Sequence, residues 1–155
     1  MYSNKENVNI LTSLLVKEGI NKAVVCPGSR NSPIVHNLCT CPDIECFPVT
    51  DERSAGFVAL GMTLADNDPV VVCVTSGSAL LNVAPAAAEA YYQNRPLIII
   101  SADRPTQWID QQDGQTIQQH QTLEPNVRKS VTLPEPHNEE EHWFCNRLIN
   151  EALHA

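Results

Sequence analysis

The stretch PVTDERSAGFVALGMTLA, residues 48–65, begins as the end of a short apolar run and continues as a helix. Thr50 or Asp51 can cap that helix, because their side-chain oxygens can accept free backbone N–H groups. Glu52 then falls in the first turn, at the end of a predicted strand. Ligands bind at this edge of an open α/β sheet, so Glu52 is either a candidate binding residue or a simple complement to the helix dipole.

The helix within this stretch is unusually rich in small residues. Its apolar residues Phe57, Leu60 and Leu64 recur at helical spacing. Gly56 and Gly61 each cost a helix about 1 kcal/mol relative to alanine. Such a helix is expected to lie close to another backbone, in the same chain or in a second copy, or to a flat ligand.

Strands and helices alternate along the rest of the chain. The predicted strands are short, apolar and rich in β-branched residues, as expected when both faces of a sheet are covered. We therefore predict one α/β domain over residues 1–155, with a doubly wound, mainly parallel sheet and helices on both faces. The predicted strands are 23–26, 44–49, 70–75, 97–101 and 128–133, and the predicted helices are 5–18, 34–39, 52–65, 79–92 and 137–153.

The last third of the chain is the hardest to assign. The glutamine-rich segment 107–121 is polar and is expected to be irregular. The final helix is expected to turn Trp143, Leu148, Ile149 and Leu153 toward the core.

Composition excludes several classes of protein. The chain carries 10 basic and 18 acidic residues, a formal net charge of −8, which argues against nucleic acid as a partner. No apolar run reaches the roughly 18 residues of a membrane span, and the N-terminus lacks a signal pattern, so a cytoplasmic protein is expected. Cys26 and Cys73 are expected to be buried thiols. Cys39, Cys41 and Cys46 lack zinc-site spacing, so no metal site is predicted.

Polar loops follow three of the predicted strands, at residues 28–30, 76–78 and 102–105. The carboxyl ends of parallel strands share one edge, so these loops can surround one site. The guanidinium of Arg30 either binds a carboxylate or pairs with a surface acid. The turn 76–78 either holds an anion through backbone N–H groups or is an ordinary helix cap. The amide-rich segment 111–119 either reads a ligand or is a solvated loop. The sequence carries no glycine-rich dinucleotide or P-loop motif and no nucleophile elbow.

Four motifs together resemble one family. They are CPGSRNSP (26–33), DERSAGFVALG (51–61), TSGSA (75–79) and SADRP (101–105). The chain resembles, from about Asn7 to its end, the N-terminal pyrimidine-binding domain of the 2-succinyl-5-enolpyruvyl-6-hydroxy-3-cyclohexene-1-carboxylate synthases, thiamine-diphosphate enzymes of menaquinone biosynthesis. The pairing of PGSR with DER is specific to that family, whereas DERxxGF alone is typical of the wider thiamine-diphosphate superfamily.

The resemblance implies catalytic roles for two residues. Glu52 matches the glutamate that hydrogen-bonds N1′ of the cofactor and so helps to remove the C2 proton of the thiazolium. A carboxyl group shielded from water, with a raised pKa, suits that task. Gln115 matches a glutamine that faces the reaction centre. Ser76, Gly77 and Ser78 match a turn near the cofactor rings.

The resemblance also implies the substrates. Ser29 and Arg30 match positions that contact substrate carboxylates, with Gln115 beside them, and Arg104 matches an arginine at the same edge. The implied reaction decarboxylates 2-oxoglutarate and adds the resulting succinyl-semialdehyde carbanion to isochorismate. The implied assembly is a homodimer or a dimer of dimers.

One part of the family pattern has no counterpart in this sequence. The diphosphate and Mg2+ site of that family is a GDG…N motif, and the only Asp-Gly pair here, Asp113-Gly114, lacks the preceding glycine. We therefore expect the chain to be a fragment of a longer multidomain enzyme, inactive alone, whose other domain largely binds thiamine diphosphate and Mg2+. The alternatives are a non-catalytic anion-binding module and a structural dimerisation domain.

Overall fold

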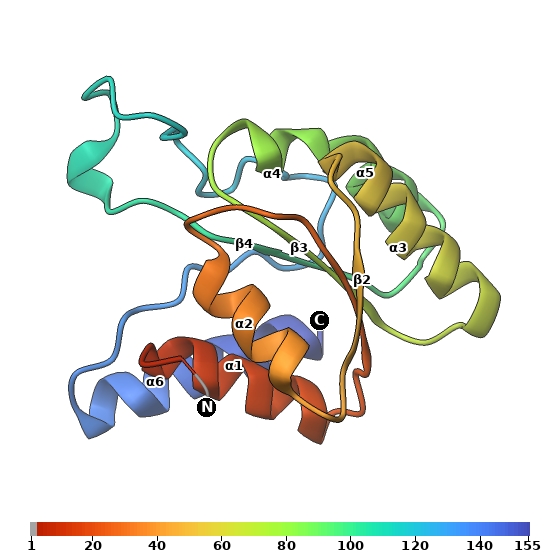
Figure 1. Ribbon diagram of the computed structural model, residues 1–155, viewed down its shortest axis with the longest axis horizontal. Coiled ribbons are helices and arrows are strands. Elements are labelled where there is room, and N and C mark those ends of the chain that lie inside the picture. Colours follow the sequence, from red (N-terminus) through yellow and green to blue (C-terminus); the bar gives the residue numbers. More distant parts are fainter. Residues whose placement is uncertain (1–2) are drawn as a thin grey trace.

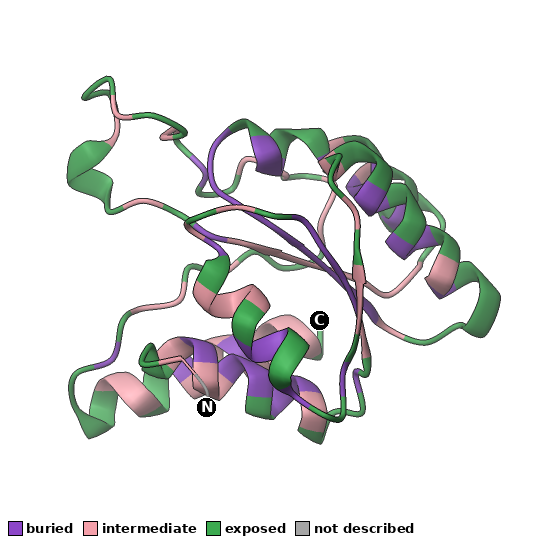
Figure 2. Cartoon of the chain, in the orientation of Figure 1, coloured by how far each residue is buried: buried purple, intermediate pink, exposed green. Residues whose placement is uncertain are grey.

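A four-stranded parallel sheet forms the centre of the protein (Figure 1). The computed structural model describes residues 3–155. The strand order is β2-β1-β3-β4, and each neighbouring pair is parallel. All five residues of β3 are buried, since this strand lies inside the sheet and is covered on both faces (Figure 2). The strands are β1 (Lys22–Val25), β2 (Glu45–Pro48), β3 (Val70–Val74) and β4 (Leu97–Ser101).

Helices cover both faces of the sheet, as predicted. One face carries α1 (Glu6–Lys17), α2 (Ser32–Thr40) and α6 (Glu139–Leu153). The other carries α3 (Glu52–Asp66), α4 (Ser78–Asn82) and α5 (Ala84–Tyr92). Two separate buried clusters fill the layers between sheet and helices. The doubly wound α/β fold expected from the sequence is therefore confirmed.

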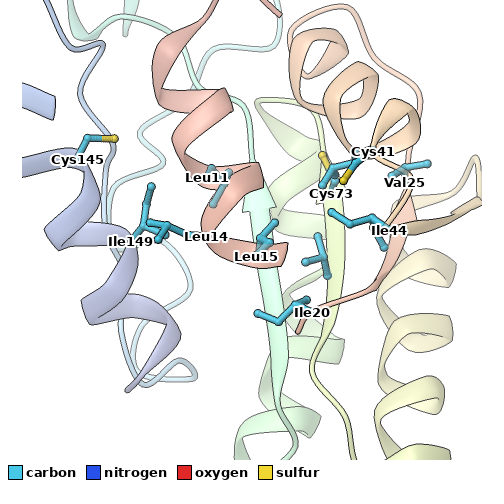
Figure 3. Packing of buried hydrophobic residues seen from close by; sticks show 13 residues of the cluster. Leu11, Leu14, Leu15, Ile20, Val25, Cys41, Ile44, Cys73, Cys145 and Ile149 are labelled. Carbon is cyan, nitrogen blue, oxygen red and sulfur yellow. The ribbon is translucent and has the colours of Figure 1, made fainter. Parts of the chain in front are cut away.

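The first apolar layer joins α1 and α6 to the sheet. Leu14 and Leu15 of α1 lie in one cluster with Cys145 and Ile149 of α6 (Figure 3). Leu15 and Cys145 are completely buried. Burying a leucine contributes roughly 2 kcal/mol, so this layer fixes α6 at the far end of the chain onto the first helix.

The start of α3 agrees with its sequence signals. Asp51 is the N-cap, and its Oδ1 accepts a hydrogen bond from the Ser54 N–H at 2.7 Å. Glu52 is the first residue of the helix, and three residues separate it from the end of β2 at Pro48. Gly56 packs on α5, where an added Cβ would lie 2.8 Å from the Cβ of Ala86. The close approach expected at Gly56 is thus made within this chain, whereas the space beside Gly61 is open.

Two helix predictions need correction. The helix predicted over 79–92 is divided into α4 and α5 at Val83, because Pro85 occupies the first turn of α5 and has no N–H for a continuous helix. Trp143 was expected to face the core but is 61% exposed. Cys145 and Ile149, four residues apart, form the buried stripe of α6, with Leu148 and Leu153 partly buried.

The strand predicted over 128–133 is wrong. Those residues form no helix or strand, and among residues 3–155 the sheet has four strands. Arg128 instead donates to the Asn94 side chain at 2.8 Å, and Lys129 pairs with Glu151 at 3.2 Å. Arg128, Lys129 and Ser130 are polar and exposed, so this half of the segment has no apolar side chains to bury against the sheet, and the segment remains a connection to α6.

No helix within residues 3–155 is both long and apolar enough to cross a membrane.

Candidate functional site

The loops after β1, β3 and β4 meet at the carboxyl edge of the sheet, as predicted from their order along the chain. A later segment, residues 111–119, folds back onto this edge; we call it the amide loop. The Ser76 hydroxyl donates to the Gln115 carbonyl at 2.9 Å. Gln119, which is buried, accepts from the Gly77 N–H at 2.6 Å and donates to the Ala102 carbonyl at 2.9 Å. These bonds tie the amide loop to β3 and β4.

Gly77 allows the amide loop to approach closely. Its φ is +80°, and an added Cβ would lie 2.9 Å from the backbone of Gln115. The Gly77 N–H is occupied by Gln119, so this turn is engaged within the chain rather than open to an anion. Ser78, which begins α4, is exposed.

Arg30 reaches across from the β1 loop to the amide loop. Its guanidinium donates to the Gln115 side-chain oxygen at 2.7 Å and to the Gly114 carbonyl at 2.7 Å. The same guanidinium lies 3.9 Å from a carboxylate oxygen of Asp113. Ser29 is exposed beside it. Two sequence-predicted residues, Arg30 and Gln115, are therefore in direct contact.

Asp113 joins Arg104 to this group. Arg104 donates to the Oδ2 atom of Asp113 through Nε at 2.8 Å, and its Nη2 lies 2.7 Å from the same oxygen. Thr116 donates its hydroxyl to that oxygen at 2.9 Å. The Thr116 hydrogen bond, then Arg104 and Arg30, hold the pKa of Asp113 below its ordinary value. We call Arg30, Arg104, Asp113 and Gln115 the arginine cluster.

Glu52 stands apart from the arginine cluster's hydrogen bonds. Its carboxylate accepts a bond from the Asn82 side-chain amide at 3.4 Å, so it faces α4 across the edge of the sheet. Burial, followed by the charges of Glu52 and Asp51, raises the pKa of the Cys26 thiol at the end of β1 to about 11. Glu52 itself is half-buried, so its carboxyl group is more exposed to solvent than the shielded carboxyl group expected from the sequence.

Two buried polar residues, Asn31 and Thr75, pack against Gly28 in the loop after β1. Asn31 is fully buried and donates to the Cys26 carbonyl at 2.8 Å. A Cβ on Gly28 would lie 2.6 Å from the Asn31 Oδ1 and 2.5 Å from the Thr75 Cβ. Only glycine fits there, which explains the glycine of the PGSR motif and places Arg30 close to the end of β3.

Sequence reasoning missed four residues of this edge: Asn31, Asn82, Asp113 and Gln119. The amide content of segment 111–119 was a signal for the last two, but nothing in it indicated which side chains turn inward. The described residues contain no group of three or more side chains able to hold a metal ion. The six cysteines are free, and Cys26 and Cys73 are buried thiols, as expected.

Residues 6–124 match the family described as "Thiamine pyrophosphate enzyme, N-terminal TPP binding domain". The chain is 58% identical, over 153 residues, to 2-succinyl-5-enolpyruvyl-6-hydroxy-3-cyclohexene-1-carboxylate synthase of Bacteroides fragilis, covering 99% of this chain and 28% of that protein. It is 44% identical to the synthase of the same name from Porphyromonas gingivalis, over 98% of this chain and 26% of that protein. The chain thus spans little more than a quarter of the length of these relatives.

The fold also matches a solved structure. The thiamine diphosphate-dependent 4-hydroxybenzoylformate decarboxylase of Rhodococcus jostii RHA1 superposes with a TM-score of 0.78 and 21% sequence identity. The match covers 96% of this chain and 27% of that one. At this identity the likeness shows the fold alone.

Proposed function

Because the chain belongs to the thiamine pyrophosphate enzymes, with the fold of their N-terminal domain, we propose that it is the pyrimidine-binding part of a 2-succinyl-5-enolpyruvyl-6-hydroxy-3-cyclohexene-1-carboxylate synthase. The names of its relatives and their 44–58% identity over nearly the whole chain support this proposal. The proposed substrates are 2-oxoglutarate and isochorismate. The position of Glu52, at the first turn of α3 and at the carboxyl edge of the sheet, is the structural observation that carries it.

Glu52 fits the pyrimidine half of thiamine diphosphate. A carboxyl group can share a proton with a ring nitrogen, and the half-buried position strengthens such a hydrogen bond over one in open water. Asn82 already donates to one Glu52 oxygen, which orients the carboxylate toward α4. When bound, thiamine diphosphate supplies the electron sink for decarboxylation. Ser76 and Gly77 are the proposed neighbours of its rings.

The diphosphate half of the cofactor does not fit this chain. Residues 3–155 offer no cluster of metal-ligating side chains, and the Gly77 N–H is already bonded to Gln119. We propose that Mg2+ and the diphosphate are bound by another part of a longer enzyme, and that this chain is inactive alone.

The arginine cluster is the proposed site for substrate carboxylates. The guanidinium groups of Arg30 and Arg104 both lie near Asp113, and Arg30 also donates to the Gln115 side chain of the amide loop. Guanidinium groups bind carboxylates through paired, charge-assisted hydrogen bonds. Both proposed substrates carry two carboxylates. Ser29 is a proposed contact of the same site because it precedes Arg30 on an exposed loop.

Self-association is proposed through the α3–α4 surface. Phe57, Val58 and Leu64 of α3 and Leu81 of α4 are each 40–45% exposed. Apolar side chains gathered in this way commonly mark a surface that another protein covers. A dimer or a dimer of dimers built on this face stays a prediction, as does the cytoplasmic location.

The test is Glu52→Gln in the full-length enzyme, with Glu140→Gln as a control on the opposite face of the sheet. Loss of the proton-sharing carboxyl group should lower kcat roughly 10²- to 10⁴-fold. The control should keep the kcat of the unmodified enzyme. Near-normal turnover of Glu52→Gln with 2-oxoglutarate and isochorismate would remove Glu52 from the mechanism, and binding of an anion without turnover would favour the non-catalytic module.

A further inference from the structure

Asp113 carries a negative charge at the centre of the arginine cluster. Its Oδ2 is 2.7 Å from Arg104 Nη2 and 3.9 Å from Arg30 Nη2. Arg104 Nε and the Thr116 hydroxyl donate hydrogen bonds to the same oxygen at 2.8 and 2.9 Å, whereas Arg30 contributes its charge from 3.9 Å. The three charged side chains are each 22–29% exposed, so the interaction is only partly screened by solvent. This is the arrangement that an incoming carboxylate would adopt between two guanidinium groups.

The amide loop engages the two terminal nitrogens of Arg30, whereas the buried Nε has no hydrogen-bond partner. Nη1 is bonded to the Gln115 side-chain oxygen and Nη2 to the Gly114 carbonyl. A ligand carboxylate that binds both terminal nitrogens of Arg30 competes with these oxygens. Asp113, Gly114 and Gln115 are consecutive, so displacement of one acceptor from the two arginines moves the others.

We propose that Asp113 is an internal carboxylate that occupies the substrate-carboxylate position between Arg30 and Arg104 and lowers the enzyme's affinity for dicarboxylate substrates. This inference rests on the proposed function, in which the two arginines receive those substrates. The cluster holds two positive charges and one negative charge, a formal +1. Neutralising Asp113 makes it +2 and removes the competing ligand, so dicarboxylates should bind more tightly.

The experiment measures glutarate, an unreactive dicarboxylate, by calorimetric titration into the full-length enzyme and its Asp113→Asn variant. The variant should bind glutarate about three- to tenfold more tightly, as expected for one partly exposed charge. The difference should shrink between low salt and about 0.5 M salt, because screening weakens it. Asp110→Asn is the matched control. Asp110 is exposed and directly precedes the amide loop, so this substitution removes the same charge from a residue outside the arginine cluster's ion pairs.

Steady-state kinetics separates competition from a merely structural role. Under the proposal, Asp113→Asn lowers the KM for 2-oxoglutarate or isochorismate while kcat changes little. Weaker glutarate binding or a raised KM in this variant would overturn the proposal, since Asp113 would then be orienting the arginines. Unchanged affinity would also overturn it.

The two proposals fail in different ways. If the unmodified enzyme turns over both substrates but Asp113→Asn binds glutarate as before, only the competition is refuted. If the unmodified enzyme shows no turnover but Asp113→Asn still tightens glutarate binding in a salt-dependent manner, the competition stands and the proposed reaction is refuted. Absence of glutarate binding to both proteins refutes the assignment of the arginine cluster as a carboxylate site.

Discussion

Replacement of Gly77 by alanine should detach the amide loop from the edge of the sheet. Gly77 has φ +80° and ψ −137°, a region that side-chain-bearing residues seldom adopt. The added Cβ would meet the Gln115 backbone at 2.9 Å, and a backbone cannot rotate away as a side-chain tip can. Either the turn or the loop must therefore move.

The size of the effect follows from these contacts. Backbone strain at such a residue costs about 1–3 kcal/mol. If the loop moves instead, the Ser76–Gln115 and Gly77–Gln119 hydrogen bonds are lost, at roughly 1 kcal/mol each. The strain route costs about 1–3 kcal/mol and the loop route about 2 kcal/mol, so the free energy of unfolding should fall by about 1–3 kcal/mol.

Urea unfolding followed by far-UV circular dichroism measures this loss. With an m-value of about 2 kcal/mol/M, the midpoint should fall by roughly 0.5–1.5 M. Gly61→Ala is the control, because nothing lies within 4 Å of its added Cβ and it sits in the exposed middle of α3. That change should stabilise the protein by up to about 1 kcal/mol. If Gly77→Ala unfolds at the same urea concentration as the unmodified chain, the close approach of the amide loop is wrong.

Three further predictions concern α6 and the thiols. Asn138→Ala should lower the free energy of unfolding by about 1 kcal/mol in the same urea assay. Asn138 is the N-cap of α6, and its side-chain oxygen accepts a hydrogen bond from the Glu141 N–H at 2.9 Å. An unchanged urea midpoint would exclude that cap. Iodoacetamide at pH 8 should modify the exposed Cys39 before the half-buried Cys46 and the buried Cys73, because burial raises the pKa of both thiols to about 12. Peptide mass spectrometry that shows Cys46 or Cys73 reacting as fast as Cys39 would contradict this. In the unfolded chain the thiols of Cys46 and Cys73 release their protons near pH 9, whereas in the folded protein they do so near pH 12. The free energy of unfolding should therefore fall as the pH rises from about 9 to 12. Cys73→Ala should make this fall less steep.

The sequence was sufficient for the four strands of the sheet and for the start of α3, although it also predicted a fifth strand that does not form. Apolar β-branched runs predicted all four strands to within two residues at each end, because buried parallel strands leave a continuous apolar signal. The capping signal of Asp51 placed Glu52 in the first turn of α3. Those features depend on residues close together in the chain, where pattern and structure are directly linked.

Long-range contacts were not predictable in the same way. Gln119 is hydrogen-bonded to Gly77, 42 positions away in the sequence, and to Ala102, 17 positions away. Local sequence periodicity carries no signal for such bonds. Asp113 was noticed only as part of an Asp-Gly pair, although two arginines converge on it. The prediction for Trp143 was wrong because it relied on the size of an apolar side chain. The positions of Cys145 and Ile149 around the helix determine which side of α6 faces the core.

The buried layers and the arginine cluster lie on different parts of the chain, which matters for redesign of the protein. The strands supply the buried layers, whereas Arg30, Asp113 and Gln115 all stand on connecting segments outside those layers. Randomising the connecting segments can therefore alter ligand selectivity while the scaffold stays folded. Gly28 and Gly77 should be kept constant in any such library, since each is the point where a connecting segment touches the scaffold too closely for a larger residue.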